Sequence, residues 1–155
     1  MILSKPKIKQ SEKKDRYPTL TVQALDYINW QSENDPSHTL PVMVKLDAAV
    51  DTKRLIQALK TAVEAHPGVD NCLKADPDGT VWQYPGTDLS GNYDPEIITV
   101  SEKELDDIRQ TLSSELMDPE ANRFYEFRIY ETKNNKYLFM RFAHSIADAE
   151  SISIL

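Results

Sequence analysis

Residues 137–149 read Tyr137-Leu-Phe-Met-Arg-Phe-Ala-His-Ser-Ile-Ala-Asp-Ala149, and this stretch decides the fold. The first six residues are apolar on both alternating faces apart from Arg141, which predicts an inner β-strand that is covered on both sides. The strand runs directly into His144. A histidine at the end of a buried strand is held at a fixed point and can still face a cleft, and imidazole exchanges protons near neutral pH. His144 is therefore the candidate catalytic residue.

The surroundings of His144 allow more than one interpretation. Strand parity places it with Leu138, Met140 and Phe142, provided that the extended conformation continues that far. Small residues on either side leave room for a substrate or for a tight turn. Asp148 either orients the imidazole or caps the helix that we expect to follow, and capping is the more common role of aspartate. A lone histidine near an apolar strand is also more often structural than catalytic.

Other catalytic and metal chemistries are poorly supported by the sequence. Ser145 is adjacent to His144, so the two side chains diverge in an extended chain, and there is no Gly-x-Ser-x-Gly turn. His38, His66 and His144 lack the spacing of metal ligands, so we expect no metal and no directly bound cofactor. Cys72 falls in a predicted strand, where a lone cysteine usually belongs to the core.

Composition and charge narrow the function classes. The length of 155 residues fits one domain, and the single cysteine suits a reducing, cytoplasmic location. Residues 1–16 carry a net charge of +4, and we expect them to form a disordered basic leader. The whole chain has a formal net charge of −7, so the remaining residues carry −11, and this negative charge argues against nucleic acid as the main ligand. The chain holds no apolar run of the ~20 residues that a membrane span requires.

The periodicity predicts an α+β fold, a two-layer sandwich of a mostly antiparallel sheet backed by helices. Expected helices cover 21–31, the stretch between Asp51 and Pro67, the stretch from the Ser101–Glu104 capping box to Leu116, and the residues after Asp148. Expected strands cover 42–46, 69–73, 80–84, 97–100, 125–132 and 137–142, with a hairpin turn at Asn134-Asn135.

Residues 17–155 resemble the N-terminal lobe of the condensation domains of nonribosomal peptide synthetases, in the chloramphenicol acetyltransferase-like superfamily. The family signature is His-His-x-x-x-Asp-Gly at the end of a strand. A degraded copy stands at Ala143-His-Ser-Ile-Ala-Asp-Ala149. His144 matches the second, catalytic histidine, Asp148 matches the aspartate that holds the loop, and Ser151 matches a serine that commonly follows. Alanine replaces the first histidine and the glycine.

Other blocks of the family are recognisable with substitutions. Gln23 matches the glutamine of a Gln-x-Arg block in which Leu25 replaces the arginine. His66 matches the histidine of an Arg-His-x-x-Leu-Arg-Thr block, whose arginines are absent here. Glu126 stands where a Pro-Leu-Phe-Arg block usually has arginine. The lost arginines leave Asp148 in need of another donor, and Arg128 or Arg141 is our candidate.

The resemblance implies an acyltransferase that forms amide bonds between thioester substrates. Peptidyl or acyl carrier proteins deliver these substrates on phosphopantetheine arms, and His144 would act on the amine. The channel lies between two lobes, so we expect the residues 17–155 lobe to be inactive without the second lobe and to self-associate through the exposed face. Whether the chain is an enzyme stays open. One alternative is a catalytically silent module that binds a carrier or partner protein, and a less favoured one is an acetyltransferase that uses coenzyme A.

Overall fold

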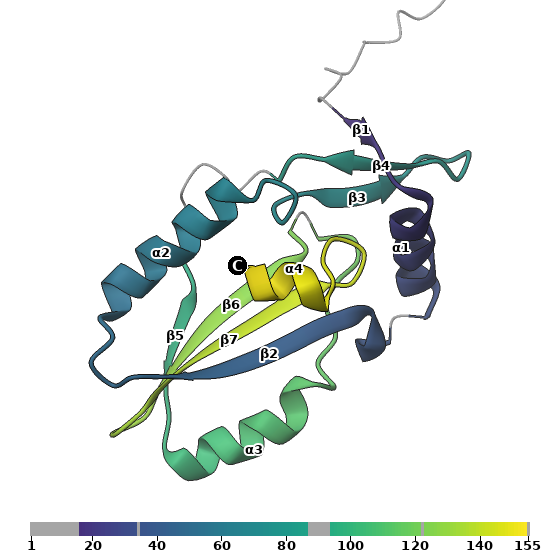
Figure 1. Cartoon of the computed structure of the whole chain (residues 1–155). Coiled ribbons are helices and arrows are strands. Elements are labelled where there is room, and N and C mark those ends of the chain that lie inside the picture. The colour runs from purple at the N-terminus through teal and green to yellow at the C-terminus, as the bar shows by residue number, and fades with distance from the viewer. Residues whose placement is uncertain (1–15, 34, 87–93, 122, 155) are drawn as a thin grey trace, which may run out of the picture.

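The computed structural model describes residues 16–33, 35–86, 94–121 and 123–154 (Figure 1). The helices are α1 (Thr21–Glu33), the 3₁₀ turn η1 (Pro36–His38), α2 (Thr52–Ala65), α3 (Glu102–Leu112) and α4 (Ala149–Ile154). The strands are β1 (Tyr17–Pro18), β2 (Thr39–Leu46), β3 (Cys72–Ala75), β4 (Val81–Tyr84), β5 (Glu96–Thr99), β6 (Tyr125–Glu131) and β7 (Lys136–Ala143). The leader expected over residues 1–16 lies outside the described residues, except for Arg16, which pairs with Asp76 at 2.9 Å.

The strands form two sheets. The larger has the order β2-β7-β6-β5, in which β5 runs parallel to β6 and the other neighbours are antiparallel. The smaller has the order β1-β4-β3 and is antiparallel. The α+β class with a mostly antiparallel sheet is confirmed. Sequence analysis missed β1, because a two-residue strand that ends in proline carries no periodic signal.

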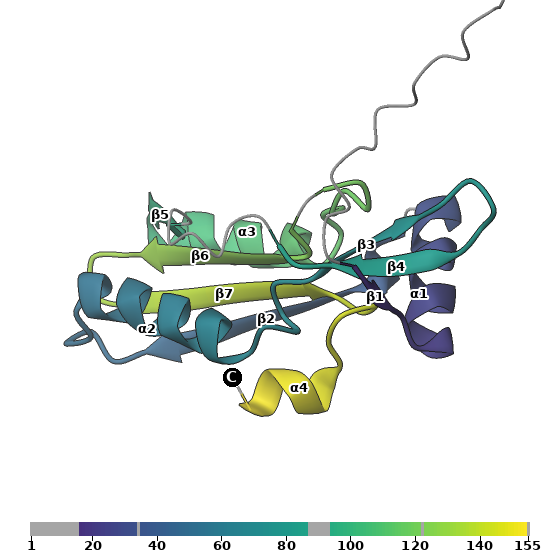
Figure 2. The same cartoon turned by 90° about the horizontal axis from the view of Figure 1, so that it is seen from above.

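Helices cover both faces of the larger sheet. In Figure 2, α3 lies on one side of β6 and β7, while α2 and α4 lie on the other side. The alternation along β7 accounts for this arrangement. Tyr137 and Phe139 pack with Leu105 and Leu112 of α3. The opposite face of the sheet packs against α2, and the buried members of that cluster include Leu138, Phe142, Leu59 and Val63. β7 is thus an inner strand covered on both sides, as its sequence predicted.

The third part of the core joins α1 and the smaller sheet to the end of β7. Tyr27 and Trp30 of α1 are 1% exposed and pack around Phe124, whose ring lies 5.1 Å from that of Trp30. Ala143, the last residue of β7, belongs to the same cluster. Burial raises the pKa of Tyr27 to about 12, so its hydroxyl stays protonated at neutral pH. This packing fixes α1 beside the segment that carries His144.

The capping residues predicted from the sequence define two helices. The Asp51 carboxylate accepts a hydrogen bond of 2.8 Å from the Arg54 amide at the start of α2, and His66 is the residue after its last turn. Ser101 and Glu104 form the expected capping box at the start of α3. Among the described residues, no helix combines the length and apolar content that a bilayer crossing requires.

The predicted end of α3 is wrong. The apolar spacing extended the helix to Leu116, whereas it ends at Leu112 and Leu116 is 52% exposed. The Ser114 hydroxyl donates to the Thr111 carbonyl at 2.8 Å, and its amide donates to the same oxygen at 2.9 Å. Serine side chains that bond to nearby backbone compete with the helical pattern, which accounts for the early end.

Candidate functional site

Three backbone hydrogen bonds fix the end of β7. The Ala143 amide donates to the Phe124 carbonyl at 2.8 Å, and the His144 amide donates to the His38 carbonyl at 2.8 Å. The chain then turns, and the Ile146 amide donates back to the Ala143 carbonyl at 3.1 Å. Because both neighbouring segments hold this corner, the Cα of His144 has a fixed position although its side chain is free to reach solvent.

The imidazole of His144 lies at the surface next to α1. Its side chain is 46% exposed, and its Nδ1 lies 3.8 Å from Asp26 Oδ2. The expectation that His144 joins Leu138 and Phe142 required an extended chain, and that conformation ends at Ala143. Sequence reasoning missed Asp26, because nothing in the local pattern of α1 links it to a residue near the other end of the chain.

Asp148 is the N-terminal cap of α4. Its Oδ1 accepts hydrogen bonds from the Ser151 amide at 2.7 Å and from the Ser151 hydroxyl at 2.6 Å. The bonds from the Ser151 hydroxyl and amide lower the pKa of Asp148 below its ordinary value, and the nearby His144 adds to this effect. Of the two roles considered for Asp148, capping is the one that the structure shows. Ser151, singled out by the resemblance, is its partner.

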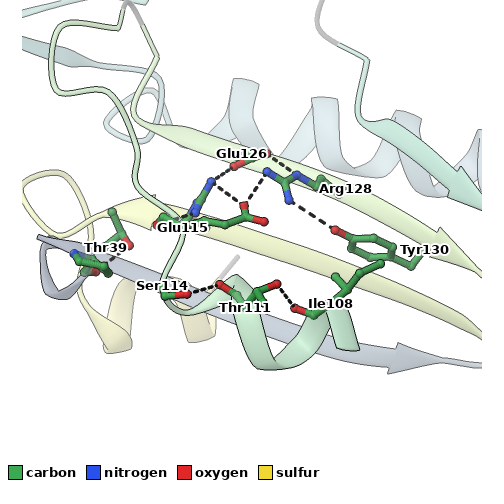
Figure 3. Close-up of polar contacts among 10 residues, drawn as sticks. Thr39, Ile108, Thr111, Ser114, Glu115, Glu126, Arg128 and Tyr130 are labelled. Atoms are coloured by element: carbon green, nitrogen blue, oxygen red, sulfur yellow. Dashed lines mark hydrogen bonds and ion pairs between the residues drawn. The ribbon is translucent and has the colours of Figure 1, made fainter. Parts of the chain in front are cut away.

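The suggestion that Arg128 or Arg141 braces Asp148 is wrong. Both guanidinium groups bind two glutamates on the α3 side of the sheet, and Figure 3 labels Arg128 and these two glutamates, Glu115 and Glu126. Glu126 accepts from Arg128 Nε and from Arg141 Nη2, each at 2.5 Å. Glu115 accepts from Arg128 Nη2 at 2.9 Å, and its carbonyl accepts from Arg141 Nη1 at 3.0 Å. Glu126 stands at the position where the sequence resemblance predicts arginine, and its carboxylate binds Arg128 and Arg141 in place of Asp148.

This network of two arginines and two glutamates has a structural role. Arg141 is 3% exposed, so its charge requires an ionic partner inside the protein. Burial lowers the pKa of Arg128, but hydrogen bonds to Glu115 and Tyr130 and the charge of Glu126 raise it above the ordinary value overall. The network ties the segment after α3 to β6 and β7, and it lines one side of a groove of about 480 Å³ that does not include His144.

The remaining candidates are dispersed. Ser145 is buried, and its hydroxyl has no hydrogen-bond partner among the described residues, so it gains no base for hydrolase chemistry. His66 and Ser151 line the same open groove of about 390 Å³ near the end of α2, and His144 is not part of its lining. Cys72 is buried in the core as predicted. Within the described ranges, no three His, Cys, Asp or Glu side chains gather as metal ligands would.

Known structures share this architecture, although sequence comparison finds no relative. No family model and no curated protein matches the chain. The first condensation domain of the calcium-dependent antibiotic synthetase, in complex with a substrate analogue, matches 90% of the chain with a TM-score of 0.72 at 14% identity. The starter condensation domain of rhizomide synthetase also matches 90%, with a TM-score of 0.77 at 9% identity.

A condensation domain of the enacyloxin polyketide synthase, described as mediating chain release, matches 93% of the chain with a TM-score of 0.68 at 15% identity. The chain spans 35%, 35% and 30% of these three structures, which is about a third of each. Identities this low establish the fold alone. The chain therefore has the fold of one lobe of the condensation domains of nonribosomal peptide and polyketide synthases.

Proposed function

We propose that this chain is the N-terminal lobe of a condensation-type acyltransferase, which joins two carrier-bound thioester substrates through an amide bond when its second lobe is present. The observation that carries the proposal is the imidazole of His144, presented on a fixed backbone corner at the end of the central strand of this fold. Peptidyl or acyl carrier proteins and their phosphopantetheine arms are the partners that the proposal requires, in the cytoplasm.

The chemistry assigned to His144 is proton transfer. As the amine of one substrate attacks the thioester carbonyl of the other, a C–N bond forms and the C–S bond breaks. His144 accepts the proton that the amine loses, and the departing thiolate takes a proton to leave as a thiol. A positioned base of this kind contributes on the order of 10²–10⁴-fold to the rate. The exposure of the ring, 46% of the side chain, leaves room for a substrate and for the opposite lobe.

The decisive experiment replaces His144 in the protein joined to its second lobe. Carriers loaded with an amino acid and with an acyl group are mixed with the His144→Ala variant, and amide product is followed by mass spectrometry. We expect the rate to fall on the order of 10²–10⁴-fold. His66→Ala is the matched control, because His66 lines a groove that does not include His144 and its loss should leave the rate close to normal. An unchanged rate in His144→Ala would remove the catalytic assignment.

The silent carrier-binding module remains the second candidate because of Ala143. This residue stands where the family has the first signature histidine, and it is fully buried in an apolar cluster. Because position 143 is part of the apolar core, it supplies no polar group to the site. Calorimetric titration of the chain with a carrier protein separates the candidates: binding without any turnover by the two-lobe protein favours the silent module, and turnover that depends on His144 excludes it.

A further inference from the structure

Two histidine–carboxylate pairs lie side by side where α1 meets the ends of β2 and β7. His144 Nδ1 lies 3.8 Å from Asp26 Oδ2, and His38 Nε2 lies 3.0 Å from Glu33 Oε2. The two histidines are neighbours, because the His144 amide donates to the His38 carbonyl. Asp26 and Glu33 are seven residues apart on α1, a spacing of about two turns that places them on one face of the helix.

The atoms that face each other differ between the pairs. Glu33 approaches the Nε2 of His38, whereas Asp26 approaches the Nδ1 of His144. In a neutral imidazole one nitrogen carries the proton and the other keeps a lone pair, and the partner of one nitrogen decides which is which. A carboxylate beside Nδ1 favours the proton there. The Nε2 of His144 then holds the lone pair that a general base needs.

We propose that Asp26 is a positioning residue for His144, which selects the tautomer with the proton on Nδ1 and leaves Nε2 as the base. This inference rests on the proposed function and deepens it by naming the reactive atom. The separation of 3.8 Å is an ion-pair distance, and the Asp26 side chain is 35% exposed.

Asp148 is a second carboxylate that interacts electrostatically with His144, and it is unsuited to this role. Its Oδ1 already accepts two hydrogen bonds from Ser151. Its position is also set by the start of α4, so that it acts on His144 only through its charge. Asp26 on α1, in contrast, has its carboxylate next to Nδ1 of His144, the residue that follows β7.

The test reads the tautomer directly in the ¹⁵N-labelled chain. Imidazole ¹⁵N shifts and two-bond ¹⁵N–¹H correlations are recorded at a pH where the ring is neutral. In the natural protein we expect His144 to carry its proton mainly on Nδ1. In Asp26→Ala the population should move to the Nε2–H form, whereas Asp26→Asn, which keeps an oxygen acceptor, should preserve the Nδ1–H form.

Glu33→Ala is the matched control, since it removes the carboxylate that pairs with the neighbouring histidine, His38. It should alter the signals of His38 and leave the tautomer of His144 unchanged. If Asp26→Ala disturbs the packing of α1, the signals of both His38 and His144 will change. The tautomer of His144 in the natural protein and in Asp26→Asn then tests the inference. An Nε2–H form of His144 in the natural protein, or the same tautomer with and without the carboxylate, would overturn the inference.

The readout does not depend on the proposed function. It needs neither carriers nor the second lobe, so a failed condensation assay leaves the tautomer result intact, and the reverse also holds. In the two-lobe protein, Asp26→Ala should lower kcat on the order of tenfold without a matched rise in KM, because a misplaced proton affects the chemical step rather than binding.

Discussion

Gly86 lies so close to Asp70 that the structure leaves no room for a side chain at position 86. A Cβ at this position would lie 2.1 Å from the Asp70 carbonyl oxygen and 2.3 Å from its Oδ2. Asp70 is 1% exposed, so neither group can move aside without disturbing the core. We expect Gly86→Ala to lower the free energy of unfolding by about 1–3 kcal/mol, the usual cost of overpacking, as measured by urea denaturation.

Gly68→Ala is the control for this prediction. No atom lies within 4 Å of the position that its Cβ would occupy. Removing a glycine at an unstrained position reduces the freedom of the unfolded chain, so we expect a neutral or slightly stabilising effect of about 0.4–1 kcal/mol. Equal stability of Gly86→Ala and the natural protein would show that the close contact is relieved at no cost.

At the same scale, the sequence located His144 but not its partner. His144 could be singled out because it follows an apolar strand, which is a local pattern. Asp148 could be assigned because it fits the local pattern of a helix cap. Asp26 could not be found in this way. Its contact with His144 depends on how α1 packs through Tyr27 and Trp30, and local spacing contains no information about that packing.

Among the elements, the junction of α2 with the β6–β7 hairpin depends on Glu131. The Thr52 hydroxyl donates to its Oε1 at 2.6 Å, and Lys136 Nζ lies 3.3 Å away. The hydrogen bond from Thr52, followed by the contact with Lys136, lowers the pKa of Glu131 below 4.5. The carboxylate therefore stabilises the fold above pH 4.5, and this contribution is lost as the pH falls through the lowered value.

Glu131→Gln should reduce the free energy of unfolding at pH 7 by about 1 kcal/mol, because the site is partly exposed and its charge is screened. At a pH below the lowered pKa of Glu131 the two proteins should become nearly equal, since the natural carboxyl group is then protonated. Urea denaturation at several pH values measures both. Glu64→Gln, on the exposed side of α2, serves as the control, and a difference that did not shrink in acid would contradict the assignment.

Sequence patterns predicted the boundaries of helices and strands correctly where a capping or turn residue defined the boundary locally. Asp51 and the Ser101–Glu104 box defined helix starts, and the turn before β7 was found from two asparagines. The end of α3 was missed because the apolar spacing continues to Leu116, whereas the Ser114 hydroxyl and amide both donate to the Thr111 carbonyl and the helix ends at Leu112. Strand β2 also begins earlier than predicted, since its first residues pair with β7 despite the proline at position 41.

At the scale of the whole molecule, the most exposed apolar side chains among the described residues lie on α1 and just before it. We call this surface the α1 ridge, which consists of Leu20, Val22, Leu25 and Ile28, at 71%, 69%, 55% and 41% exposure. Contiguous exposed apolar surface favours association. We expect the chain to self-associate through this ridge, so that light scattering at high concentration gives a mass well above 17.7 kDa.

Leu25→Glu should return the chain to a monomer, because a charge placed in the ridge must be desolvated in the complex. Leu116→Glu is the matched control: it places the same charge on a leucine that is 52% exposed after α3, and it should leave association unchanged. A natural protein that remains monomeric at every concentration would refute the prediction.

Pro41 disfavours the pairing of another strand with the free edge of β2. It lies in β2, which is an edge strand of the larger sheet, opposite Arg141. Proline has no N–H, so the free margin of the sheet offers an interrupted row of donors to any incoming strand. Copies of this lobe that meet are thereby discouraged from stacking strand on strand into fibrils, and contact through side chains of a helix, which is finite and reversible, is left as the favoured route.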